Sequence, residues 1–227
     1  MQNKTAILVF ANSSQEELSH KAIPKSKLLF DLLTQQTLDT VKKTKLPYFH
    51  LTEEQQVGGS FGERFTNAIQ FIFAKGFDHI ITIGNDTPHL KVAHILDAGS
   101  HLKNGKAVLG PSADGGFYLM ALHRSQFNIS DFKKLTWKSS KLFLETSRLF
   151  AAQNVVLVQL KTLFDLDTVS DLQVFINQYA SVSNQLFRSI LSLLRIRVKK
   201  IHFRFTFCTI TLSETYFNKG SPSALYQ

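Results

Sequence analysis

Short apolar segments alternate along the chain with longer amphipathic ones, and this alternation limits the possible folds more than any other feature. The apolar runs have the length of strands and comprise residues 6–10, 48–51, 79–83, 106–109, 117–120 and 155–160. The longer segments carry apolar residues at helical spacing and comprise residues 26–43, 62–75, 88–101 and 139–152. Such alternation predicts a three-layer α/β/α fold with a mainly parallel sheet.

The composition is that of a globular protein with a substantial core. The chain has 227 residues, of which 44% are hydrophobic and 19% charged, so an intrinsically disordered chain is excluded. The single cysteine, Cys208, cannot form an internal disulfide bond. No apolar run approaches the roughly 18 residues that a membrane span needs. We therefore expect a cytoplasmic protein without a membrane span.

Positive charge is concentrated at the C-terminal end. From residue 177 onward seven basic residues accompany one acidic residue, Glu214, within a total net charge of +9. We expect residues 1–180 to form the main domain and residues 181–227 a basic appendage of a helix and a strand. Apolar residues, mostly phenylalanines, alternate with polar ones over residues 201–208, which favours packing, for example in a homodimer, over binding of nucleic acid.

Four aspartates follow predicted strands. Asp86 comes after residues 79–83, Asp114 after residues 106–109, and Asp165 and Asp167 after residues 155–160. Ligands of open α/β sheets bind at the carboxyl ends of the strands, where gathered carboxylates would repel one another without a cation. Hard oxygen ligands suit Mg²⁺ or Mn²⁺, and such an ion usually completes its shell with water and phosphate. The pattern thus predicts a phosphorylated or nucleotide substrate.

Simpler interpretations exist for two of these aspartates. Asp86, two residues before Pro88, could cap the helix that follows. Asp114 precedes Gly115 and Gly116, and this sequence suits either a close approach of a ligand or a turn in which the aspartate bonds its own backbone.

One further segment has the spacing of a serine-hydrolase motif. Residues 58–62 match the Gly-x-Ser-x-Gly nucleophile elbow, but the polar residues 52–56 separate them from the preceding strand. The elbow must turn directly from strand into helix, so this activity is disfavoured.

Four motifs in order resemble those of the bacterial glycosyltransferase-A-like transferases of the selenodomain-associated type, which are related to the phospholactate guanylyltransferases. They are IGNDTPHL at 83–90, VLGPSADGGFYL at 108–119, Trp137 ahead of Ser139 and Ser140, and DLDTVSDL at 165–172. The resemblance covers roughly residues 5–175. It implies a nucleotide-diphospho-sugar transferase-like (GT-A) fold.

The resemblance also implies roles at the metal and acceptor sides of a site. Asp86 matches the metal-binding aspartate, Asp167 a second ligand, and Asp165 a less certain neighbour. Asp86 and Asp114 would be catalytic, with Asp114 orienting or deprotonating an acceptor hydroxyl. The acceptor side would comprise Gly115, Gly116 and Trp137.

The nucleotide side has a clear departure from the family pattern. Gln56, Gly58 and Gly62 match a segment that often faces the base, and we assign Asn12 and Lys25 to the nucleotide as well. In place of the family's loop of glycine and basic residues, residues 11–17 end in two glutamates, which would repel a triphosphate unless a lysine at 21, 25 or 27 folds back over it.

Two functions follow from these observations. The first is a metal-dependent transferase that uses Mg²⁺ or Mn²⁺, a nucleotide-activated donor and a small-molecule acceptor, and that passes on a glycosyl or nucleotidyl group. The alternative is a catalytically inactive nucleotide- or sugar-binding module whose basic tail serves interaction.

Overall fold

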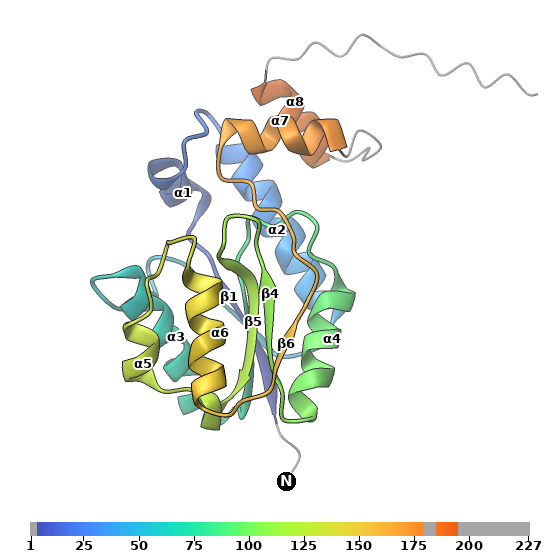
Figure 1. The fold of residues 1–227 in the computed structure, drawn as a ribbon. Helices are drawn as coiled ribbons and strands as arrows, with labels where there is room; N and C mark the ends of the chain where they lie inside the picture. Colours follow the sequence, from blue (N-terminus) through green and yellow to red (C-terminus); the bar gives the residue numbers. More distant parts are fainter. Residues whose placement is uncertain (1–3, 179–184, 195–227) are drawn as a thin grey trace, which may run out of the picture. The chain divides into compact units, whose positions relative to one another are not determined.

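The computed structural model describes residues 4–178 and 185–194. A six-stranded sheet of order β2-β1-β3-β5-β4-β6 forms its centre (Figure 1). The strands are β1 (Thr5–Phe10), β2 (Tyr48–Leu51), β3 (His79–Ile83), β4 (Ala107–Pro111), β5 (Phe117–His123) and β6 (Leu157–Gln159). The helices are α1 (Ser14–His20), α2 (Lys27–Lys43), α3 (Phe61–Ala74), α4 (Val92–Lys103), α5 (Ile129–Lys133), α6 (Leu142–Ala152), α7 (Val169–Gln178) and α8 (Gln185–Leu193), with a 3₁₀ turn η1 (Arg124–Gln126).

The sheet is mainly parallel, as predicted, with one strand reversed. β1 pairs in parallel with β2 and β3, and β4 pairs in parallel with β6. β5 runs antiparallel between β3 and β4, with Ile81 opposite Ala121. From β1 the chain passes to β2 on one side and to β3 on the other, so the strand order reverses at the carboxyl ends of β1 and β3. Open α/β sheets bind ligands at such a point.

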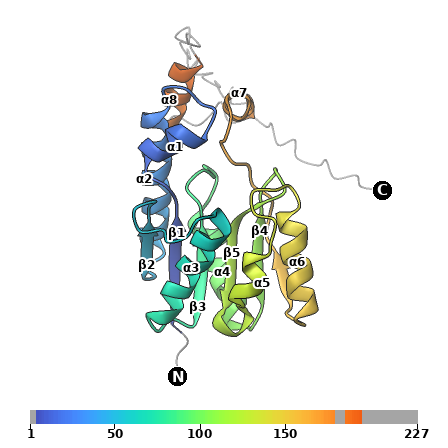
Figure 2. The ribbon, with the colours of Figure 1, turned by 90° about the vertical axis from the view of Figure 1, so that its left-hand side faces the viewer.

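Helices cover both faces of the sheet. One core contains Leu8 and Ile80 from the strands with Ile69 of α3, Phe132 of α5 and Phe150 of α6. The other contains the alternate strand residues, with Val41 of α2 and several side chains of α4. Figure 2 shows α3, α5 and α6 in front of the sheet, and the three-layer prediction is confirmed. Within the described residues, none of the helices combines the length and hydrophobicity that crossing a membrane requires.

A third apolar cluster lies where the N-terminal part of α2 meets α7 and α8. Its buried members include Phe30 and Leu33 of α2, Phe175 of α7, and Leu186 and Ile190 of α8. The strand predicted after residue 195 and Cys208 lie outside the described residues.

Two segments differ from their simplest interpretation. Residues 11–17 stand in place of the family's loop, but from Ser14 to His20 the chain forms α1, which Ser13 caps by accepting a hydrogen bond from the Glu16 amide. Asp86 does not cap α4, which begins at Val92 with Lys91 before it, so the capping interpretation is wrong.

The serine of the hydrolase-like motif also has a structural role. Ser60 accepts a hydrogen bond from the Glu63 amide, and the Glu63 carboxylate accepts one from the Ser60 amide. This capping box begins α3, and nine residues separate the last residue of β2 from the first residue of that helix. The structure thus agrees that residues 58–62 do not form a nucleophile elbow.

Candidate functional site

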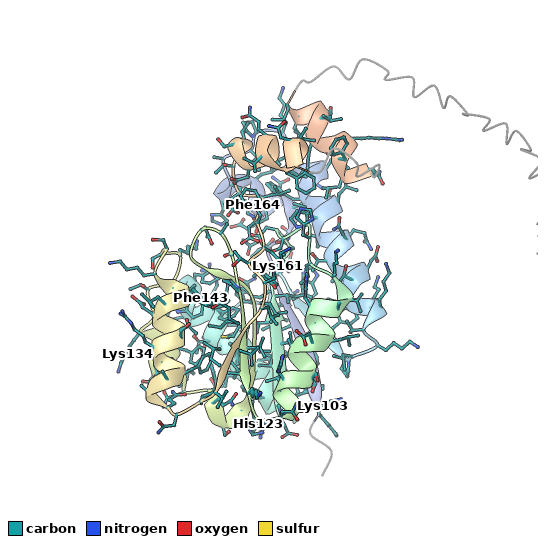
Figure 3. All side chains as sticks on the ribbon, turned by 45° about the vertical axis from the view of Figure 1, so that its right-hand side comes forward. Lys103, His123, Lys134, Phe143, Lys161 and Phe164 are labelled. Atoms are coloured by element: carbon teal, nitrogen blue, oxygen red, sulfur yellow. The ribbon has the colours of Figure 1, made fainter. Side chains whose placement is uncertain are left out.

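A cavity of about 550 Å³ opens at the carboxyl ends of β1, β3 and β4. Figure 3 labels Lys161 and Phe164 near this end of the molecule, whereas His123, at the end of β5, and Lys103 lie at the opposite end. Seven of the predicted site residues line the cavity, namely Asn12, Asp86, Asp114, Gly116, Trp137, Asp165 and Asp167. A volume of this size accommodates a small-molecule ligand.

The predicted aspartates converge around a lysine. Lys21 Nζ lies 2.9 Å from Asp86 Oδ2 and 2.8 Å from Asp167 Oδ1. The two carboxylate oxygens therefore lie no farther apart than the sum of these two distances. The same nitrogen lies 3.8 Å from Glu17 Oε2 and donates to the Leu166 carbonyl at 3.4 Å. The prediction that Asp86 and Asp167 lie close together is confirmed, although the sequence did not predict the ammonium between them.

Burial and the ammonium together set the charges of this pair. Burial alone would raise the pKa of Asp86, but the adjacent Lys21 outweighs it and holds that pKa below its ordinary value. At Asp167 the effect of burial is larger than that of Lys21, so the pKa of Asp167 is raised. Burial alone would lower the pKa of Lys21, but the carboxylates of Asp86, Asp167 and Glu17 raise it above the usual value.

Backbone hydrogen bonds hold the segments of this acidic end together. The Leu166 amide donates to the Asp86 carbonyl at 2.9 Å, which ties the segment after β6 to the loop after β3. Ala22 forms a parallel β-bridge with Thr168, which ties the end of α1 to the same segment. The carboxylates therefore converge on a scaffold of main-chain contacts, which positions them before any ligand arrives.

Asp165 lies beside this pair in a different state. Its Oδ1 accepts a hydrogen bond from Thr87 Oγ1 at 2.5 Å. Burial, followed by the negative charge of Asp86, raises the pKa of Asp165 to about 8, with smaller contributions from Asp167 and Asp114. The carboxyl of Asp165 is therefore mainly protonated at neutral pH, which reduces the repulsion within the cluster.

Asp114 forms the turn that was one of its two interpretations. Its Oδ1 accepts hydrogen bonds from Ser112 Oγ at 2.5 Å and from the Gly116 amide at 2.9 Å. Asp114 is nevertheless exposed and lines the cavity, so its predicted role toward an acceptor remains a prediction.

Aromatic side chains of Phe10, Phe61, Phe65 and Trp137 form another part of the cavity lining, called here the aromatic wall. The Trp137 ring lies 4.9 Å from the Phe65 ring and 5.6 Å from the Phe61 ring, centroid to centroid. Phe10 contacts both phenylalanines edge to face. Trp137 Nε1 donates to the Phe132 carbonyl at 2.8 Å, which fixes the indole. The cavity thus has an acidic end and an aromatic wall.

Five predicted site residues lie outside the lining. Lys25 is exposed in the connection between α1 and α2, and Gln56 donates to the Leu51 carbonyl at 3.0 Å. Gly58 and Gly62 flank the start of α3, and Gly115 contacts the Ser140 backbone. Their predicted binding roles remain predictions, and the neighbours of Gly62 and Gly115 also give those glycines a packing role.

The divergent segment after β1 places one glutamate in the cavity. Glu17 is buried and lines it, and burial raises the pKa of Glu17 although Lys21 lowers it. Glu16 instead pairs with His20 at 2.9 Å. Of the three lysines considered for the phosphates, only Lys21 lines the cavity, while Lys27 pairs with Asp31 on the surface of α2.

The acidic end holds a positively charged side chain and offers few protein ligands to a metal ion. The Lys21 ammonium shows that a positive charge fits between Asp86 and Asp167. In the part of the chain that the structure describes, there is no group of three or more histidine, cysteine or acidic side chains that could hold a metal ion. A magnesium-like ion would therefore use the oxygens of Asp86 and Asp167 and take its remaining ligands from water and phosphate.

The sequence suggested Lys21 only as a possible phosphate ligand, and it predicted neither the bridge that Lys21 makes nor the aromatic part of the lining. Lys21 lies four residues after Glu17, a spacing that signals a helical ion pair but not the bridge to two distant aspartates. Phe10 and Phe65 were predicted as apolar residues of a strand and a helix, and both are also buried in the core. Phe61 was given no role, and it packs against that core.

Comparisons with known proteins bear on the family and the fold. The family model described as "Uncharacterized protein conserved in bacteria (DUF2064)" matches residues 25–139, more than half of the chain. None of the curated proteins compared with the chain matches it.

Two solved structures show the fold. One is a protein from Desulfovibrio desulfuricans G20 proposed to be a nucleotide-diphospho-sugar transferase, with a TM-score of 0.69 and 23% identity over 86% of this chain and 95% of that one. The other is 4-diphosphocytidyl-2C-methyl-D-erythritol synthase from Anaerococcus prevotii DSM 20548, with a TM-score of 0.50 and 12% identity over 79% of this chain and 97% of that one. The predicted nucleotide-diphospho-sugar transferase-like fold is confirmed.

Proposed function

The chain belongs to the bacterial family DUF2064, and from this premise we propose that its cavity binds a nucleotide-activated donor and transfers a glycosyl or nucleotidyl group to a small acceptor. The observation that carries the proposal is the convergence of Asp86 and Asp167 at the strand-order reversal, beside an aromatic wall. The likeness of the fold to the Desulfovibrio protein supports the same class of activity.

Asp86 and Asp167 are the residues that would hold Mg²⁺ or Mn²⁺. The ion would supply positive charge to the donor phosphates and to the leaving group. Asp165, mainly protonated at neutral pH, would donate or accept a hydrogen bond at the edge of this pair. The main-chain contacts of Leu166 and Ala22 hold these carboxylates in place.

The remaining lining residues would bind and orient the two substrates. Trp137 and Phe61 present ring surface for the apolar face of a sugar or a base. Arg64 and Lys138 also line the cavity and would attract phosphate oxygens. Asp114, exposed in the cavity, would accept a hydrogen bond from an acceptor hydroxyl and, in catalysis, its proton.

A thermal-shift screen of nucleoside diphosphate sugars and nucleoside triphosphates, with and without Mn²⁺, tests this function. We expect at least one compound to raise the melting temperature only when Mn²⁺ is present, and Asp86→Asn to remove that shift. Asp39→Asn, at an exposed carboxylate of α2, is the matched control and should keep it. A hit whose effect is the same in Asp86→Asn and the wild type would contradict the assignment of Asp86.

The catalytically inactive binding module stays as the second candidate because of two contacts. Lys21 neutralises the charge between Asp86 and Asp167, and Asp114 is engaged by Ser112 and Gly116. If a donor binds but neither hydrolysis nor transfer to a panel of sugar and phosphate acceptors occurs, the binding module is the better description.

A further inference from the structure

The Lys21 ammonium occupies the point between Asp86 and Asp167 that the proposed cation would need. We infer that Lys21 is a tethered counter-ion that must leave this point before a divalent cation binds there, so that cation binding depends on a phosphate ligand that draws Lys21 away. This inference rests on the proposed function and extends it to the order in which the ligands bind.

Lys21 is held at both ends of its side chain. Its backbone amide donates to the Glu17 carbonyl at 2.9 Å and ends α1, and its Nζ reaches two carboxylates and the Leu166 carbonyl. Its side chain is only 12% exposed. The fold therefore fixes the position of the ammonium, whereas an exposed lysine side chain can adopt many conformations.

Other lysine–aspartate pairs of the described chain provide a contrast. In the Lys27–Asp31 pair the lysine side chain is 55% exposed, and the Lys42–Asp39 pair is similarly open. Such surface pairs contribute little to stability because water screens their charges. The ion pairs of Lys21 are partly shielded from water. In such an environment, removing one partner leaves the charge of the other uncompensated.

An ammonium and a divalent cation exclude each other at this point. Both need the same carboxylate oxygens, and two positive charges separated by a few ångströms repel strongly where water is scarce. The protein's own ammonium therefore lowers the affinity of the pair for a free cation.

A phosphate ligand would allow a divalent cation to bind by drawing the Lys21 ammonium away from the two aspartates. Lys21 lines the cavity in which the donor would bind, so donor phosphates would offer its ammonium an alternative anionic partner. With the ammonium on the phosphate, Asp86 and Asp167 are left with uncompensated charge that a divalent cation can neutralise. Phosphate and cation should then bind with positive coupling, and that coupling should pass through Lys21.

Titration with Mn²⁺, followed by the electron paramagnetic resonance signal of the free ion, tests this in the metal-free protein. Without phosphate, we expect Lys21→Met to bind Mn²⁺ roughly tenfold or more tightly than the wild type, within the usual range of coupling between sites. Lys27→Met, which removes an exposed lysine, is the matched control and should bind Mn²⁺ as the wild type does. Should Lys21→Met fail to fold by circular dichroism, Lys21→Gln carries the same comparison.

The titration separates this inference from the function on which it rests. Equal Mn²⁺ affinity in the wild type and Lys21→Met overturns the displacement of Lys21 but leaves the cation site in place. If neither protein binds Mn²⁺, the cation site itself is wrong and the inference falls with it, whatever the thermal-shift screen says of donor binding.

Discussion

A Cβ atom added to Gly62 would lie 2.3 Å from Cδ1 of Trp137. Gly62 is buried in the first turn of α3, and the indole packs directly on its backbone. Glycine at this position thus lets the tryptophan pack closely against α3 and complete the aromatic wall of the cavity. The contact links a residue assigned to the nucleotide with one assigned to the acceptor side.

Gly62→Ala is expected to push the indole out of its place. Overpacking of this kind costs about 1–3 kcal/mol, which lowers the melting temperature by roughly 2–4 °C per kcal/mol in a domain of this size. Trp137 is the only tryptophan in the chain, so its fluorescence should shift to the red as the ring gains exposure. Gly59→Ala is the control, since its Cβ would come no closer than 3.4 Å to a neighbour, the Glu63 carboxylate. Equal fluorescence spectra for the two variants would show that the indole does not depend on Gly62.

Gly115→Ala should destabilise the protein more than a glycine replacement that strains the backbone without causing a steric clash. Gly115 has a φ of +93°, and an added Cβ would lie 2.1 Å from the Ser140 carbonyl oxygen. Gly105 also has a positive φ, +73°, but an added Cβ there meets no atom within 4 Å. Both alanine variants therefore incur the backbone strain, and only Gly115→Ala adds the clash.

Chemical denaturation measures the difference between the two variants. We expect the free energy of unfolding to fall by at least about 1 kcal/mol more in Gly115→Ala than in Gly105→Ala. Similar losses in the two would mean that the Ser140 backbone moves aside at little cost.

Asp165→Asn should become more stable relative to the wild type as the pH rises. Burial and the charge of Asp86 raise the pKa of Asp165 to about 8 in the folded protein, well above the value in an unfolded chain. A raised pKa gives stability that is complete below the unfolded pKa and is lost as the pH rises through the folded one. Asparagine resembles the protonated acid and does not titrate, so the variant avoids this loss.

The comparison is made by denaturant unfolding in the presence of a chelator, at pH 6 and pH 9. The free energy of unfolding of Asp165→Asn should gain at least about 1 kcal/mol on the wild type over this interval. Asp39→Asn controls for the loss of an exposed aspartate. A difference that stays constant, or that reverses, would show that Asp165 is ionised in the folded protein at neutral pH.

The sequence predicted the layers of the fold because its strands and helices have clear periodicity. Buried strands such as β1 and β3 are short apolar runs, and α3 carries Phe65, Ile69 and Ile72 on one face. The direction of β5 could not be predicted, because a buried antiparallel strand has the same apolar pattern as a parallel one.

The site was predictable where it depends on strand ends and unpredictable where it depends on a long side chain. Asp86 and Asp167 converge because both follow strands at one edge of the sheet. Lys21 reaches them from the end of α1, and that short helix depends on a Ser13 cap with no apolar period to reveal it. The aromatic wall was hidden for a related reason, since residues that line a cavity and residues of a core look alike in a sequence.

Anomalous scattering from crystals grown with Mn²⁺ and pyrophosphate tests the central claim most directly, because it locates the cation. We predict a manganese peak between Asp86 and Asp167, about 2.1 Å from a carboxylate oxygen of each, with the Lys21 ammonium moved onto the pyrophosphate. A bound pyrophosphate in this cavity with no manganese peak between the two aspartates, and with Lys21 still bridging them, would contradict the account.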